Sequence, residues 1–175
     1  MRVAGIDLAA KEDNITGLCI IEGKRIITDS KKSDEDILSF IFSNSPDLVA
    51  IDSPLTLSTT RYAEKYLKRY GAMSLKIPWI RRLAIRGMRI AENIKEHKID
   101  VIEVFPTATA KILEFYQKPK KNMVEYFTNQ GFTFENDVKN EHEVDAVIAA
   151  YTALLYLENK TESIDGVIIP KKLLK

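Results

Sequence analysis

Three short apolar runs that each end in a single carboxylate constrain this chain more than any other feature. Runs of this length and composition are typical of buried strands, in which a lone carboxylate is costly and Asp is disfavoured. One such acid is usually a strand-end cap, whereas three on separate strands call for a shared explanation. If the strands are neighbours in one sheet, the side chains could converge on one spot. The acids are Asp7 in residues 2–8, Asp52 in residues 48–52 and Glu103 in residues 101–105.

The remaining pattern predicts an α/β fold with a mixed sheet flanked by helices. A hairpin start turning at Gly23 is followed by strands that alternate with helices, which is typical of crossover units. The 175 residues suit a single domain, 1–175, and contain no linker or internal repeat. Further strands are expected at 15–21 and 25–28, helices at 34–43, 60–72, 80–97, 108–116, 121–129 and 141–158, and a strand or extended tail at 167–170.

A fourth acid, Asp145, lies in the first turn of the helix expected at 141–158. It stands beside the apolar stripe of that helix, and His142, three residues earlier, is its neighbour on the helix surface. Alanines around it would let the helix approach a sheet closely. A purely structural role is also open, because an acid in the first turn complements the helix dipole. Asn140 and Glu143 form a capping-box-like pair, which explains Glu143 structurally.

Together these acids have the chemistry of a divalent-metal site. Carboxylates held close together repel and raise each other's pKa values unless a cation lies among them. Hard oxygen ligands suit Mg²⁺ or Mn²⁺, and such ions can activate water and stabilise the leaving oxygen of a phosphodiester. No spacing within the set is diagnostic by itself. The candidate metal ligands are Asp7, Asp52, Glu103 and Asp145, with His142 as a further candidate catalytic residue.

Basic residues are concentrated between the fourth and fifth strands. Residues 61–89 contain nine Lys and Arg and one Glu, a net charge of +8, so the rest of the chain carries −7. Such an excess indicates a polyanionic partner, and Arg suits phosphate because of its forked guanidinium. We therefore expect a basic helical segment at about 60–97 that contacts nucleic acid. The candidate substrate-binding residues are Lys65, Arg69, Arg81, Arg82, Arg86 and Arg89, with Arg86 foremost.

The composition favours a cytoplasmic protein. A single cysteine, Cys19, excludes an internal disulfide, no apolar run is long enough to span a bilayer, and the first residues lack the pattern of an export signal.

Five motifs, taken in order, resemble a widespread family of predicted nucleases with the ribonuclease H fold, related to RuvC-type resolvases. The resemblance extends over nearly the whole chain, and the motifs are specific as a set although each is weak alone. They are residues 5–9 (GIDLA), 50–54 (AIDSP), 86–87 (RG), 102–109 (IEVFPTAT) and 142–146 (HEVDA).

The resemblance implies a five-stranded mixed sheet whose first three strands are antiparallel. It also implies that Asp7 is the central metal ligand, that Asp52 occupies the place of an acid on the fourth strand of RuvC-like enzymes, and that His142 and Asp145 match their paired helix positions. Glu103 belongs to the predicted-nuclease pattern alone and has no firm counterpart in the resolvases. RuvC-type relatives are often dimers, so a homodimer is possible.

Two other functions fit parts of the pattern. An actin-like phosphotransferase or ATPase would also begin with a strand ending in an acid, but it needs Gly-rich phosphate-binding turns, and this chain has seven glycines, none of them adjacent. A non-catalytic nucleic-acid-binding module of the same fold would have no reason to hold four acids at these positions. The favoured function is therefore a Mg²⁺- or Mn²⁺-dependent nuclease, with DNA and RNA both open as substrates.

Overall fold

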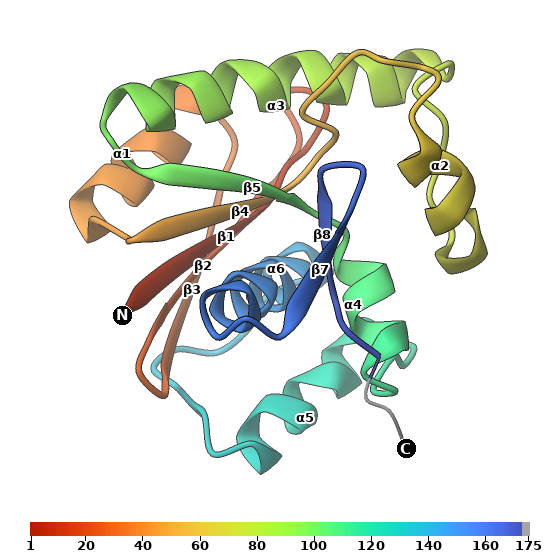
Figure 1. Ribbon diagram of the computed structural model, residues 1–175. Coiled ribbons are helices and arrows are strands. Elements are labelled where there is room, and N and C mark those ends of the chain that lie inside the picture. Colours follow the sequence, from red (N-terminus) through yellow and green to blue (C-terminus); the bar gives the residue numbers. More distant parts are fainter. Residues whose placement is uncertain (173–175) are drawn as a thin grey trace.

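The computed structural model describes residues 1–172, which form one mixed sheet with helices on both faces (Figure 1). The strand order is β6-β3-β2-β1-β4-β5-β8-β7, with β1, β4, β5 and β8 parallel to one another. The strands are β1 (Arg2–Asp7), β2 (Thr16–Glu22), β3 (Arg25–Lys31), β4 (Leu48–Asp52), β5 (Asp100–Val104), β6 (Thr133–Phe134), β7 (Thr161–Ile164) and β8 (Val167–Pro170).

The helices cover the sheet in two layers. On one face, α1 and α3 pack against β1, β2 and β4 through Ile37, Ile41, Ile90 and Ile94; on the other, α6 lies along β1 and β2 with α4 and α5 beside it (Figure 1). None of these helices is long and apolar enough to cross a membrane. Their bounds are α1 (Asp34–Asn44), α2 (Tyr62–Leu67), α3 (Pro78–Glu96), α4 (Pro106–Ile112), α5 (Val124–Asn129) and α6 (Glu141–Leu157), with 3₁₀ turns η1 (Lys68–Tyr70) and η2 (Lys120–Met123).

The mixed α/β architecture and the antiparallel arrangement of β1, β2 and β3 are confirmed, whereas the expected count of five strands is wrong. The additional strands lie at the sheet edges. β7 and β8 form a hairpin whose turn is Asp165-Gly166, both with positive φ, and an Asp-Gly turn of this kind is a standard hairpin signal. β6 is only two residues long and pairs with β3, which is too short for a periodic pattern to reveal.

Two glycines let α6 lie directly on the sheet. A Cβ on Gly5 of β1 would fall 2.0 Å from the carbonyl oxygen of Ala146, and one on Gly17 of β2 would fall 2.0 Å from that of His142. Real Cβ atoms do not approach backbone this closely, so both positions require glycine. The first turns of α6 are therefore held against the end of β1.

The start of α6 is fixed by its cap and by a buried carboxylate. The side chain of Asn140 accepts a hydrogen bond from the backbone N–H of Glu143, as expected of an N-cap. The Glu143 carboxylate, however, does not return to Asn140; it accepts hydrogen bonds from Thr28 Oγ1, Ser30 Oγ and the Lys139 N–H. Glu143 thus ties the first turn of α6 to β3, which is a structural role.

We predict that Gly5→Ala lowers the free energy of unfolding by about 1–3 kcal/mol or more, because the added methyl group must push α6 off the sheet. Urea denaturation followed by circular dichroism measures the loss. Gly23→Asn is the matched control: a Cβ there meets nothing within 4 Å, and Asn tolerates the positive φ of that turn. Equal midpoints for Gly5→Ala and the parent chain would contradict the close approach.

Candidate functional site

Four of the predicted site residues lie together at the carboxyl ends of β1 and β4. Asp7 and Asp52 are the last residues of these adjacent parallel strands and are paired in register. The start of α6 adds Asp145 and His142, and the Nδ1 atom of His142 lies 2.8 Å from Oδ2 of Asp7. Residues far apart in the chain therefore form one cluster, the acidic cluster: Asp7, Asp52, Asp145 and His142.

The acidic cluster is electrostatically strained without a cation. Burial raises the pKa of Asp52 well above its ordinary value, and the charges of Asp7 and Asp145 raise it further. Burial and Asp7 likewise raise the pKa of Asp145 to about 6. The hydrogen bond to Asp7 raises the pKa of His142, so this imidazole more readily carries a positive charge beside the carboxylates.

A fifth residue, Lys120, enters the cluster from η2. Its Nζ donates a hydrogen bond to Oδ2 of Asp145. Burial alone would lower the pKa of Lys120, but Asp145, Asp7 and Asp52 together raise it above its ordinary value. Lys120 is not among the residues that the sequence predicted, because it lies in a basic, aperiodic stretch beside Pro119. Only the fold brings it to α6.

Glu103 does not join these side chains. Its two carboxylate oxygens accept hydrogen bonds from both amino groups of Arg61, at 2.6 and 2.8 Å, and Oε2 also accepts one from the Leu55 N–H. Both side chains of the pair are about nine-tenths buried. A bidentate guanidinium already neutralises its charge, so Glu103 lies outside the acidic cluster in this structure, and its role as a metal ligand stays a prediction.

The remaining donor set fits a divalent cation in its chemistry. Three carboxylates that repel one another need a positive charge between them, and the ammonium group of Lys120 is at present the stand-in cation. Within residues 1–172, no three His, Cys, Asp or Glu side chains are already arranged as a group that could hold a metal ion. An ion bound here would therefore need these side chains to move, since Asp145 is paired with Lys120.

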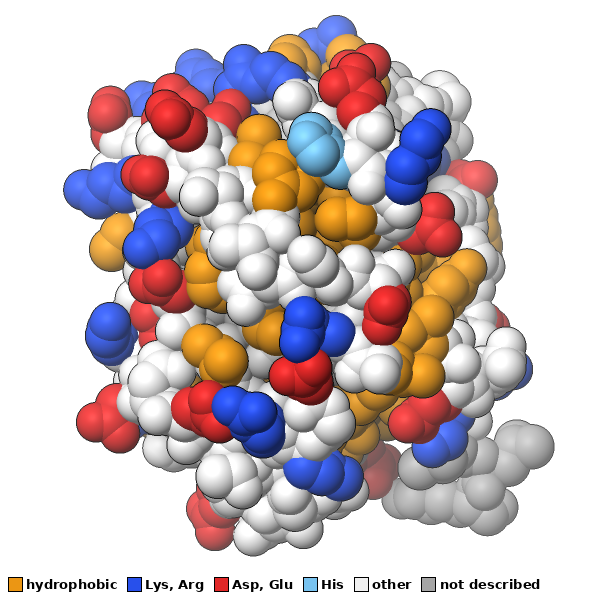
Figure 2. Space-filling view, turned by 90° about the vertical axis from the view of Figure 1, so that its left-hand side faces the viewer, with side chains coloured by type: hydrophobic (Ala, Val, Ile, Leu, Met, Phe, Trp, Pro, Cys, Tyr) orange, Lys and Arg blue, Asp and Glu red, His pale blue; other side chains and the backbone are white. Residues whose placement is uncertain are grey.

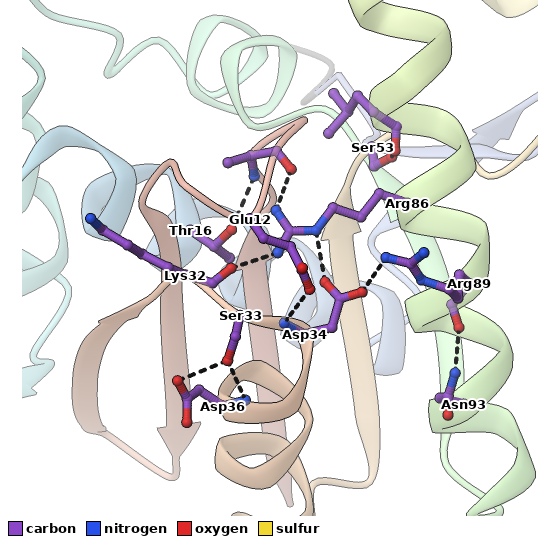
Figure 3. Close-up of polar contacts among 12 residues, drawn as sticks. Glu12, Thr16, Lys32, Ser33, Asp34, Asp36, Ser53, Arg86, Arg89 and Asn93 are labelled. Carbon is purple, nitrogen blue, oxygen red and sulfur yellow. Dashed lines mark hydrogen bonds and ion pairs between the residues drawn. The ribbon is translucent and has the colours of Figure 1, made fainter.

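Arg86 is buried rather than exposed to solvent, and Figure 3 shows its guanidinium directed at Asp34 and at backbone oxygens. Only 4% of its side chain is exposed, and its guanidinium donates hydrogen bonds to Oδ1 of Asp34 and to the carbonyl oxygens of Ala9 and Lys32. Burial alone would raise the pKa of Asp34, but Arg86 and Arg89 lower it below its ordinary value. The expectation that Arg86 contacts phosphate is therefore corrected: it joins α3 to the segments that follow β1 and β3.

The other candidate substrate-binding residues are exposed. Arg81 and Arg82 lie on the outside of α3, Lys65 on α2 and Arg69 on η1, where its guanidinium lies over the ring of Tyr66. Arg89 is also exposed, although it pairs with Asp34. On the face drawn in Figure 2, by contrast, acidic and basic side chains are interspersed, and no patch of one sign gathers there.

We predict that Arg86→Ala lowers the free energy of unfolding by about 3 kcal/mol or more, because it removes a buried guanidinium, leaves two carbonyl groups unpaired and leaves Asp34 with Arg89 alone. Arg81→Ala, a substitution on the exposed side of the same helix, should leave stability unchanged. Urea denaturation compares the two variants. Unchanged stability of Arg86→Ala together with weaker nucleic-acid binding would restore the phosphate role.

We also predict that, in EDTA, the acidic cluster lowers the stability of the folded state more at high pH than at low pH. Asp145 has a folded-state pKa of about 6, above its unfolded value, so the folded state holds extra protons and loses stability as the pH rises from about 4 through about 6. Asp52→Asn removes one of the repelling charges. It should raise the melting temperature more at pH 8 than at pH 5, because protonation of Asp145 already relieves the repulsion at the lower pH. A rise of equal size at both pH values would contradict this electrostatic origin.

Comparisons with known proteins agree with the fold. No family model and no curated protein matches the sequence. Among solved structures, Thermus thermophilus RuvC is similar at a TM-score of 0.56 and 17% identity, covering 98% of this chain and all of RuvC. The same organism's RuvC in complex with Holliday junction substrate is similar at a TM-score of 0.57 and 16% identity, covering 98% of this chain and 99% of that one. The chain therefore has the ribonuclease H-like fold of the RuvC structures over almost its whole described length.

Proposed function

We propose that this chain is a metal-dependent nuclease that hydrolyses phosphodiester bonds of a nucleic acid. One observation carries the proposal: carboxylates from β1, β4 and α6 converge in the acidic cluster, although burying them together is costly. Proteins retain such strain mainly where a ligand relieves it or chemistry uses it. The likeness to a RuvC structure in complex with Holliday junction substrate supports a nucleic acid as the partner.

Asp7, Asp52 and Asp145 are the proposed ligands of Mg²⁺ or Mn²⁺. A bound ion of this kind supplies a more acidic water and positive charge for the oxygens of the phosphodiester. Asp7 is central, because it contacts both Asp52 and His142. The carboxyl ends of the two strands hold Asp7 and Asp52 on rigid backbone.

The two cationic side chains act on the substrate side of the cluster. His142, half-exposed and hydrogen-bonded to Asp7, can hold a proton next to the reacting phosphate and release it to the leaving oxygen. Lys120, once freed from Asp145, can pair with a phosphate oxygen. Their positive charges also limit the repulsion between the carboxylates and an approaching phosphate.

Exposed cations outside the cluster are proposed to position the nucleic-acid backbone. Contacts from Arg81, Arg82, Arg89, Lys65 and Arg69 would fix the strand without reading its sequence. The possible homodimer is a separate proposal, which the mass of the protein in solution tests directly.

We predict that the purified chain with Mn²⁺ or Mg²⁺ cleaves DNA or RNA and that Asp7→Asn lowers the rate at least about 100-fold, since the central ligand is lost. The substrates are single strands, duplexes and four-way junctions of both DNA and RNA. Asp100→Asn, an exposed acid at the opposite end of β5, is the control and should cleave as the parent does. Cleavage by Asp7→Asn at the parental rate would place the chemistry elsewhere, and binding without cleavage by the parent would favour a non-catalytic module.

A further inference from the structure

A cavity of about 250 Å³ opens directly beside the acidic cluster. The ends of β1, β4 and β5 form one wall, and α2, the segment after η1 and the start of α3 form the other. Asp7 and Asp52 belong to both the cavity and the cluster. A group that occupies this cavity is therefore next to the proposed reacting phosphate.

The lining of the cavity is mostly apolar, and large apolar side chains at its mouth are exposed to solvent. Ala63, Leu67 and Ile80 are buried in its interior. Met73 is 52% exposed and Trp79 is 45% exposed. Flat or polarisable apolar side chains at a cavity mouth are typical of sites that hold a planar ring.

One polar group within the lining has no partner. Arg61 donates both amino groups to Glu103, but its Nε–H is buried without a hydrogen-bond acceptor, although only 10% of the side chain is exposed. Because this Nε atom has almost no accessible surface, a group in the cavity does not reach it while Arg61 is paired with Glu103. The lining thus combines an apolar slot with a buried ion pair, Arg61–Glu103.

We propose that this cavity receives one unstacked nucleobase of the substrate, a proposal that rests on the proposed nuclease function. Its volume lies below the roughly 300 Å³ at which pockets for drug-sized ligands begin, so it suits a single planar ring system. The ring would stack against Trp79 and Met73 at the edge of the apolar lining. Enzymes that bind an extruded base hold it between aromatic or apolar side chains in the same way.

Binding of a base in this cavity determines the substrate class. A base inside a regular duplex stack cannot enter a side pocket, whereas an unpaired base can. Seating the base would also hold the adjoining phosphodiester against the carboxylates. The substrate is therefore single-stranded or locally unpaired nucleic acid, and continuous duplex is excluded.

The fluorescence of Trp79 tests the binding step, because it is the only tryptophan in the chain. The probe is a short single-stranded oligonucleotide, as DNA and as RNA, added to the Asp7→Asn chain with Mg²⁺ so that it is not cleaved. Quenching of the fluorescence is expected, and an oligonucleotide of the same length with abasic sites should quench it at least about fivefold less. Equal quenching by the two oligonucleotides would overturn the base-binding proposal.

Cleavage kinetics test the consequence. Trp79→Ala, and Ala72→Phe, which fills the cavity from its wall, should each lower kcat/KM on the single strand about tenfold or more. Trp79→Phe should recover most of the kcat/KM that Trp79→Ala loses. Neither Trp79→Ala nor Ala72→Phe should alter the cleavage of an abasic substrate. Ile85→Ala removes an exposed side chain of the same helix outside the cavity and serves as the control.

These outcomes separate the two proposals. If Trp79→Ala and Ala72→Phe fold and cleave as the parent does while Asp7→Asn is inactive, the base pocket is wrong and the nuclease function stands. If the parent cleaves duplex faster than single strand, the base-binding proposal is also wrong. If the parent neither binds nor cleaves any of the nucleic acids, both proposals fail.

Discussion

The close packing of α6 on β1 and β2 is the constraint on which the rest of the structure depends. Backbone meets backbone at Gly5 and Gly17, with no side chain between them. This approach places the first turn of α6 within hydrogen-bonding distance of the end of β1, so His142 reaches Asp7. A helix at an ordinary packing distance from the sheet would leave Asp145 and His142 too far from the strand acids for one site.

The acids of the cluster differ from the other acids of the protein in how their charges are neutralised. Other carboxylates with little exposed surface are satisfied in two ways. Glu143 accepts three hydrogen bonds, whereas Glu103 is paired with Arg61 and Asp34 with Arg86. Asp7, Asp52 and Asp145 have only the partial help of Lys120 and His142. The contrast between satisfied and unsatisfied acids distinguishes the candidate site from its structural neighbours.

Sequence patterns predicted most of the framework, because apolar periodicity reports burial directly. The central strands, α1, α3 and α6 follow from it, as does the grouping of Asp7 and Asp52 at strand ends. The ion pairs of Glu103 and Arg86 could not be predicted, because a buried acid or arginine has the same local sequence pattern whichever partner it contacts. Arg61 lies 42 residues from Glu103, and Lys120 lies 25 residues from Asp145. Such contacts depend on the three-dimensional path of the loops, which no local pattern encodes.

The segment between β4 and β5 has a consequence for how this molecule can diversify. The side chains of the acidic cluster come from β1, β4, η2 and α6. The outer wall of the cavity is built by α2, the segment after η1 and the start of α3, and the exposed cations lie on α2, η1 and α3. Arg86 anchors that segment to the body through backbone carbonyls, which any sequence at those positions would supply. Substitutions on its outer surface can therefore change the cavity wall and the surface charge while the strands and the helix that hold the acidic cluster stay as they are, so the two parts of the molecule can vary separately.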